Sequence, residues 1–181
     1  MEPADRSAGS RFGYAVVASA LHDAEAVDHV TAAVRDLLDT VGGERDGSTG
    51  PHLYVVATGG TERLLLDAVA RRHLAHPDEP IVLVTHRAHN SLPAALETLA
   101  ALHQHGERGR IVFVSGDAER DRTELDEAVG DLEAWHRLRS TRLGVVGGAS
   151  SWLVASEPSA EAVRRRWGPE HGKRGRSAMT A

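Results

Sequence analysis

The stretch "IVLVTHRAHNSLPAALETLAAL", residues 81–102, passes from a continuous apolar run into an amphipathic segment through a polar hinge. An uninterrupted, β-branched run of this length is typical of a strand buried on both faces of a parallel sheet. Apolar residues then recur at helical spacing over residues 91–104. The stretch therefore predicts a strand, a turn that carries the polar residues Thr85–Ser91, and a helix.

The same pattern recurs along the chain. Strands are predicted over residues 14–21, 53–57, 81–85, 111–115 and 143–147. Helices are predicted over 23–39, 61–75, 91–104, 119–138 and 159–167. We expect Ser159 to cap the last helix. Five strand–helix units predict an α/β fold: a three-layer, doubly wound, five-stranded parallel sheet with the flavodoxin-like order 2-1-3-4-5.

The length of 181 residues fits one domain with short flanking segments. We predict a disordered N-terminus over residues 1–11, a single α/β domain over 12–168, and a disordered C-terminal tail over 169–181. The glycine-rich stretch 42–52 is predicted to be a loop. No signal-peptide pattern begins the sequence.

Composition narrows the classes of function. The chain is 41% hydrophobic and 26% charged, with a net charge of −5, which argues against a nucleic-acid partner. Cysteine is absent, which excludes disulfides and thiolate nucleophiles and favours the cytoplasm. No apolar run is long enough for a membrane helix. Lys173 is the only lysine, so a Schiff-base mechanism is excluded, and the arginine and alanine content suggests a bacterial source.

In an open parallel sheet, ligands bind beyond the carboxyl ends of the strands, where the strand order reverses. For the predicted order, this point lies between the first and third strands. The segments expected to line it are Ser19–His22, Thr58–Glu62, Thr85–Ser91, Ser115–Asp117 and Gly147–Trp152. Helix N-termini at this edge favour polar ligands.

The segment "ATGGTE", residues 57–62, follows a predicted strand and opens a helix. Gly59 and Gly60 allow a tight turn and close approach to a ligand, while Thr58 or Thr61 could cap the helix. The segment lacks the spacing of a Walker A loop or a dinucleotide fingerprint. It is either a plain turn or a polar ligand loop that includes Glu62.

The segment "THRAHNS", residues 85–91, allows four interpretations. His86 and His89 could share a metal, although a catalytic metal usually needs a third protein ligand. Either histidine could instead act as a general base, with Asp117 or Glu62 as its partner. The loop could bind a hydroxylated ligand, or it could simply hold a helix cap and solvated histidines. Its other candidate ligand-binding residues are Arg87, Asn90 and Ser91.

The segment "GVVGGASSWLVAS", residues 144–156, closes the predicted sheet. Trp152 either covers the edge of the core or forms an apolar wall for the face of a sugar. In the second case Ser150 and Ser151 would donate to ligand hydroxyls, and Gly148 would line the turn.

The segments "TGGTE", "VTHRAHNSLPAALETLAAL" and "LGVVGGASSWLVAS", followed by "AVRRRWG", resemble the N-terminal region of L-fucose isomerase-like proteins, in the fucose/arabinose isomerase group. The resemblance covers roughly residues 14–168. It implies aldose–ketose isomerisation with a divalent metal, usually manganese, held by residues of later domains. No residue here matches those ligands. By the resemblance, His86, His89, Asn90 and Trp152 would shape a substrate entrance, often that of a neighbouring subunit.

We therefore expect a stand-alone, sugar-isomerase-type N-terminal domain that binds a sugar or polyol. It would be non-catalytic alone, would complement or regulate a separate catalytic chain, and would form a homo-oligomer. No cofactor is expected in this chain, and manganese only with a partner catalytic domain. One alternative is a small isomerase or lyase that uses His86 or His89 on a hydroxylated substrate. Another is an interaction protein with a vestigial crevice.

Overall fold

The computed structural model describes residues 11–47, 50–146, 150, 152, 154 and 158–174. The chain divides into two compact units, Met1–Leu132 and Glu133–Ala181. The division falls within one helix, α4 (Ala118–Ser140). The sequence predicted a single domain over residues 12–168, and this stays a prediction.

The first unit is built on a five-stranded sheet. Its strands are β1 (Phe12–Val17), β2 (Gly43–Arg45), β3 (His52–Val56), β4 (Ile81–Thr85) and β5 (Gly109–Phe113). Their order is β2-β1-β3-β4-β5, and every neighbouring pair is parallel. The predicted α/β class, the five-stranded parallel sheet and the order 2-1-3-4-5 are confirmed.

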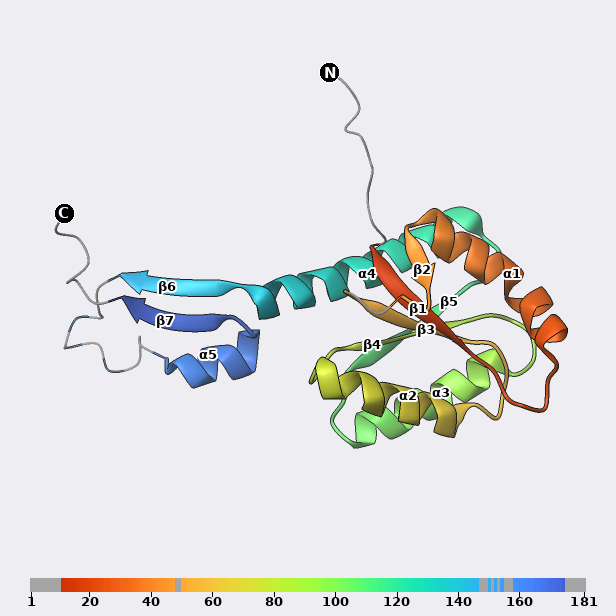
Figure 1. Ribbon diagram of the computed structural model, residues 1–181, viewed down its shortest axis with the longest axis horizontal. Coiled ribbons are helices and arrows are strands. Elements are labelled where there is room, and N and C mark those ends of the chain that lie inside the picture. The colour runs from red at the N-terminus through yellow and green to blue at the C-terminus, as the bar shows by residue number, and fades with distance from the viewer. Residues whose placement is uncertain are drawn as a thin grey trace, which may run out of the picture. The chain divides into compact units, whose positions relative to one another are not determined.

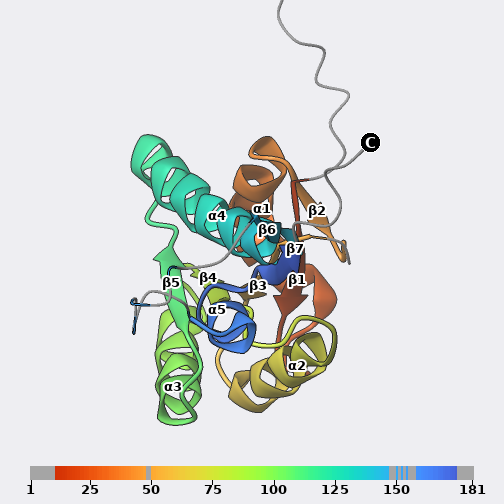
Figure 2. The ribbon, with the colours of Figure 1, turned by 90° about the vertical axis from the view of Figure 1, so that its left-hand side faces the viewer.

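Helices cover both faces of this sheet, as Figures 1 and 2 show. One face packs against α1 (Ala24–Thr40) and α4, and the other against α2 (Glu62–Ala75) and α3 (Ser91–Gln104). Successive strand residues point to opposite faces, so Val55 packs into the α1/α4 core and Val56 into the α2/α3 core. This explains why the strands read as continuous apolar runs.

One strand of the sheet was missed. β2 lies inside the stretch 42–52 that was predicted to be a loop, and it pairs with residues Phe12–Tyr14 of β1. β2 is a three-residue edge strand, and both Glu44 and Arg45 are exposed. An exposed edge strand needs no apolar run, so hydrophobic patterning gives no sign of it.

The second unit contains β6 (Arg142–Val146), α5 (Ala160–Trp167) and β7 (Glu170–Arg174). β6 and β7 form a separate two-stranded parallel sheet. The assignment of residues 143–147 to the main sheet was therefore wrong, because an apolar run identifies a strand but not its partner. β7 begins the stretch predicted to be a disordered tail. The predicted cap is confirmed: Ser159 Oγ accepts a hydrogen bond from Ala162 N at 3.1 Å.

No helix in the described part of the chain combines the length and apolar character needed to cross a bilayer.

Candidate functional site

Three loops meet at the carboxyl edge of the main sheet. The order reverses between β1 and β3. The prediction placed residues 81–85 beside the first strand, but residues 52–56 lie there, because the missed strand β2 takes the other side of β1. The loops after β1, β3 and β4 are tied together at this point. Ser19 N donates to Thr58 Oγ1 at 2.9 Å, which joins the first two loops. Gly59 N donates to His89 O at 2.7 Å, which joins the second and third. These bonds fix the relative positions of all three loops.

The two glycines of the β3 loop are needed for this arrangement. A Cβ on Gly59 would lie 3.0 Å from Asn90 Cβ, closer than most side chains tolerate. Gly60 has a φ of +72°, in the left-handed region that glycine adopts most easily. The sequence signal "GG" thus reflects close packing against the β4 loop at one position and backbone conformation at the other.

A cavity of about 400 Å³ opens where the loops meet. The residues that line it are His22, Gly59, Gly60, Glu62, His89, Asn90, Pro93 and Ala94. A second hollow, of about 240 Å³, lies at the amino ends of β4 and β5, and it includes the apolar residues Ile81, Val82 and Leu132. The first cavity combines two imidazoles, a carboxylate and an amide, which makes it the better candidate for polar chemistry.

His86 and Ser91 face inward and hold the β4 loop to β3. Ser91 Oγ donates to Val56 O at 2.5 Å and accepts from His86 N at 3.1 Å. His86 Nε2 lies 3.0 Å from Ala57 O, and Ala88 N donates to His86 Nδ1 at 3.2 Å. Because Nδ1 accepts a hydrogen bond, the proton of the neutral ring is on Nε2. Both ring nitrogens are therefore engaged by the backbone.

Burial lowers the pKa of His86, although the bond to Ala57 O partly opposes that shift, and nearby His89 lowers the pKa further. The side chain is 7% exposed. A buried neutral imidazole with two backbone partners positions a loop, and it has no ring nitrogen left for a ligand.

His89 and Asn90 are the residues of this loop that reach the cavity. Both are exposed, and their φ values of 51° and 56° are left-handed, which is unusual for two consecutive residues other than glycine. The His89 ring contacts the His22 ring edge to face, with 5.4 Å between the centroids. The side chains of both residues line the cavity.

Two helices begin at the cavity without a side-chain cap. Thr61, at the start of α2, donates its hydroxyl to Thr58 O at 2.8 Å, and neither Thr61 nor Asn90 accepts from its own helix. Thr58 or Thr61 was predicted to cap α2, and Asn90 or Ser91 to cap α3. Thr61 and Asn90 occupy the two N-cap positions, but neither side chain makes a capping hydrogen bond. The side chains of Thr58 and Thr61 are both buried: Thr58 joins the β3 loop to the β1 loop, and Thr61 bonds within the β3 loop.

Asp117 was predicted to be the partner of a histidine base, but it caps a helix instead. It is exposed, and its Oδ1 accepts from Arg120 N at 3.2 Å, which caps α4. Neither Asp117 nor the exposed Arg87 is among the residues that line the cavity. Within the described residues, no group of three or more His, Asp or Glu side chains is arranged to hold a metal ion.

The remaining predicted residues follow β6. Because β6 pairs with β7, the loop after it does not extend from the main sheet. Ser150 and the exposed Trp152 belong to the second unit. Gly148 and Ser151 lie outside the described residues.

Among the polar side chains that line the cavity, His22 is the one to which the sequence analysis gave no role. It was counted in the edge segment Ser19–His22, but nothing in its neighbours distinguishes it from a surface histidine. Its Nδ1 is shielded from solvent and has no hydrogen-bond partner in the described part of the chain. The only available signal was its position directly after the first strand.

No protein-family model matches this sequence, and no curated protein is significantly similar to it.

Proposed function

We propose that the first unit binds a small hydroxylated molecule, a sugar or polyol, in the cavity between the β1, β3 and β4 loops. Within this proposal the chain is non-catalytic alone and complements or regulates a separate catalytic chain. The observation that carries the proposal is the cavity's lining by His22, Glu62, His89 and Asn90, which arrive on separate loops and helices.

The lining chemistry suits hydroxyl groups. Imidazole, carboxylate and amide side chains each accept hydrogen bonds, and imidazole and amide also donate them. Pro93 and Ala94 add a small apolar surface on one side. Sites for small polar ligands commonly combine such an apolar surface with a few convergent polar groups.

The proposal that the chain is non-catalytic is supported by two residues that the sequence suggested as catalytic, His86 and Asp117. His86 has both ring nitrogens bound to the backbone. Asp117 caps α4. A general base must reach the proton that it removes, and neither residue lines the cavity.

The proposal is tested by calorimetric titration of the full chain with a panel of aldoses, ketoses and polyols. We expect saturable binding of at least one compound, and we expect His89→Ala to weaken it about tenfold, the usual worth of one or two lost hydrogen bonds. The matched control is His103→Ala, at the exposed far end of α3, which should bind normally. Equal binding by both variants would refute the site.

A second candidate is a small isomerase or lyase in which His89 is the general base and Glu62 its partner. It is favoured by one observation: both residues line the same cavity. Turnover of the bound sugar by the purified chain, abolished in Glu62→Gln while binding persists, would establish this function in place of the binding-only one.

A further inference from the structure

The two units of the chain carry net charges of opposite sign, although the whole chain has a net charge of −5. Residues 133–181 carry nine lysines and arginines and four acids, a formal charge of +5. Residues 1–132 carry twelve arginines and twenty-two acids, which gives a formal charge of −10. An asymmetry of this size between two units points to interaction surfaces rather than to fold.

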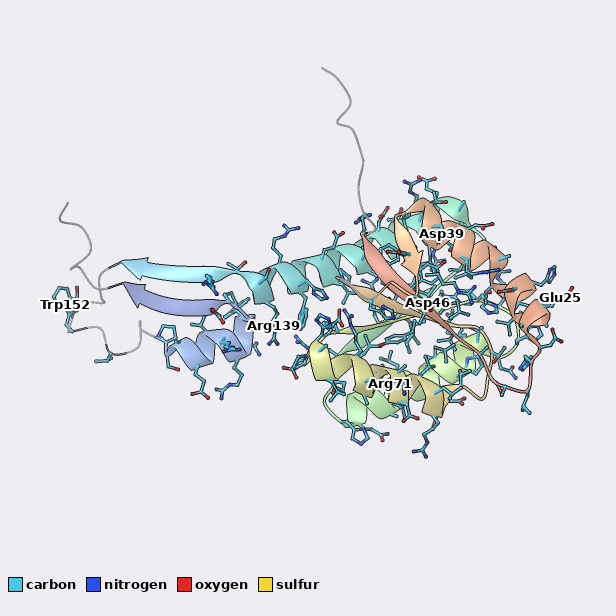
Figure 3. The ribbon with its side chains drawn as sticks, viewed as in Figure 1. Glu25, Asp39, Asp46, Arg71, Arg139 and Trp152 are labelled. Carbon is cyan, nitrogen blue, oxygen red and sulfur yellow. The ribbon has the colours of Figure 1, made fainter. Side chains whose placement is uncertain are left out.

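The acidic charge of the first unit is concentrated on one layer. On α1 and on residues 118–132 of α4, nine acids that are not buried accompany three arginines. On α2 and α3, three acids accompany three arginines. In Figure 3, Glu25 and Asp39 mark the two ends of α1, and Arg71 lies on α2. Arg11, Arg45 and Arg110, from outside these two helices, pair with Asp126, Asp28 and Asp131 and reduce the acidic excess. The α1/α4 layer still carries more acids than arginines and forms an acidic surface, whereas the opposite layer is balanced.

The basic charge of the second unit is most concentrated on α5. Its last turn carries Arg164, Arg165 and Arg166, and Trp167 follows with 65% of its surface exposed. Arginine and tryptophan are the residues most enriched at the centres of protein interfaces. No described residue of α5 is buried. Ala162 and Val163 are half-buried, and Arg164–Trp167 are exposed, so this end of the helix is open to a partner.

The described residues of the second unit contribute no side chain to the buried core. The chain's buried core side chains, among the described residues, all come from residues 12–132. In the second unit the large apolar side chains Leu143, Trp152, Val154 and Trp167 are exposed. Parallel strands are normally covered on both faces, and units of this size are marginal alone. A partner surface would supply the missing burial.

We propose that the chain forms a reciprocal dimer in which the basic face of α5 (Arg164–Trp167) of each copy docks on the acidic α1/α4 surface of the other. A second copy is the occupant that the charges favour, because each chain carries both complementary surfaces. Two-fold symmetry then forms the contact twice and closes the assembly without leaving either surface unpaired. This inference is independent of the proposed ligand.

Charge reversal on each surface tests the dimer. Arg165→Glu/Arg166→Glu reverses α5, and Asp36→Arg/Glu127→Arg reverses one exposed acid on each helix of the acidic layer. By analytical ultracentrifugation of the full chain at low salt, we expect the wild type to dimerise and each variant alone to be monomeric. An equimolar mixture of the two variants should dimerise, because both contacts become complementary again. Circular dichroism verifies that each variant is folded.

Two controls sharpen the experiment. Arg63→Glu/Arg71→Glu reverses two exposed arginines on α2, on the balanced layer, and should leave the dimer intact. Raising the ionic strength from about 0.01 M to about 1 M shortens the screening length from about 30 Å to about 3 Å and should weaken the dimer at least tenfold. A wild type that is monomeric at every concentration tested, or a variant mixture that stays monomeric, would overturn the proposal, whether or not α5 binds another partner.

Discussion

The loops after β4 and β5 leave the same edge of the sheet and carry similar polar residues, yet only the β4 loop lines the cavity. In the β5 loop, the polar groups bond to one another. Asp121, which is 2% exposed, accepts from Ser115 N, Ser115 Oγ and Gly116 N at 2.8–3.0 Å. Burial alone would raise the pKa of Asp121, but these bonds outweigh it and lower that pKa. The side chains of Ser115 and Asp121 are therefore used within the protein, and no residue of this loop lines the cavity.

In the β4 loop, some residues anchor the loop and others are exposed. His86 and Ser91 bond to the backbone of β3 and of the loop itself, which frees His89 and Asn90 to reach the cavity. In both loops buried side chains satisfy backbone groups, but only the β4 loop also has polar side chains that line the cavity. Position alone does not decide it.

The largest loss of stability is expected in the β5 loop. Asp121→Ala removes the acceptor for two backbone amides and a hydroxyl, and each buried donor left unpaired costs about 1–3 kcal/mol. We expect the free energy of unfolding to fall by about 3 kcal/mol, with ligand affinity unchanged, as measured by urea denaturation and calorimetry. Asp117→Ala, which removes only an exposed cap, should cost about 1 kcal/mol. Loss of ligand affinity in Asp121→Ala would break the contrast between the loops.

In the β4 loop, the corresponding change is Ser91→Ala. It removes the bonds to Val56 O and His86 N, so we expect about 2 kcal/mol of lost stability. Here the ligand affinity should also fall, because the loop that presents His89 loosens. Ser140→Ala, at the exposed end of α4, should change stability by less than about 0.5 kcal/mol. A destabilised Ser91→Ala that binds normally would show that the anchors and the site are independent.

The anchoring role of His86 also predicts a pH dependence. Its folded pKa is lowered from the ordinary value of 6.5, so the unfolded chain binds the proton more readily. The stability that this histidine contributes is complete above pH 6.5 and is lost as pH falls towards the lowered folded pKa. His86→Gln keeps a donor near Ala57 O but cannot titrate, so its melting temperature should fall less steeply below pH 6.5.

The control for this profile is His103→Gln at an exposed position, which should follow the wild-type curve. Burial and, secondarily, Arg72 also lower the pKa of His52. Part of the loss of stability at acid pH should therefore persist in His86→Gln. An unchanged profile in His86→Gln would contradict the buried, neutral state of this ring.

The smallest effects are expected for paired glycine substitutions. Gly60→Ala places a side chain at a φ of +72° and should cost about 1 kcal/mol. Gly130→Ala, inside α4 with open space around it, should instead stabilise by about 0.5–1 kcal/mol. Chemical denaturation measures both. Stabilisation by Gly60→Ala would contradict the assigned backbone conformation of the β3 loop.

Much of the first unit follows from the sequence. Continuous apolar runs and helical periodicity locate β1, β3, β4, β5 and all four of its helices, because burial on both faces leaves a strong pattern. β2 and β7 escape notice because their sequences are polar and contain no apolar run. The pairing of β6 with β7 could not be predicted, since strand partners depend on the path of the whole chain.

The candidate site was predicted in part. Gly59, Gly60, Glu62, His89 and Asn90 were named from two loops, and the structure brings them together. His86, Ser91, Thr58 and Thr61 were also named, but their side chains point into the protein as anchors. Residue type and loop position are the same for both groups. Only the hydrogen bonds to β3 and to neighbouring loops, which the sequence does not display, separate them.

The most direct test of the account is an NMR titration of the isotope-labelled full chain with the sugar or polyol that calorimetry identifies. If the β1, β3 and β4 loops form one binding site, the backbone amides of His22, Gly59, Gly60, His89 and Asn90 should shift together with a single dissociation constant. The amides of Ser115, Gly116 and Asp117 should remain unchanged. Shifts confined to the β5 loop or to the second unit would contradict the account.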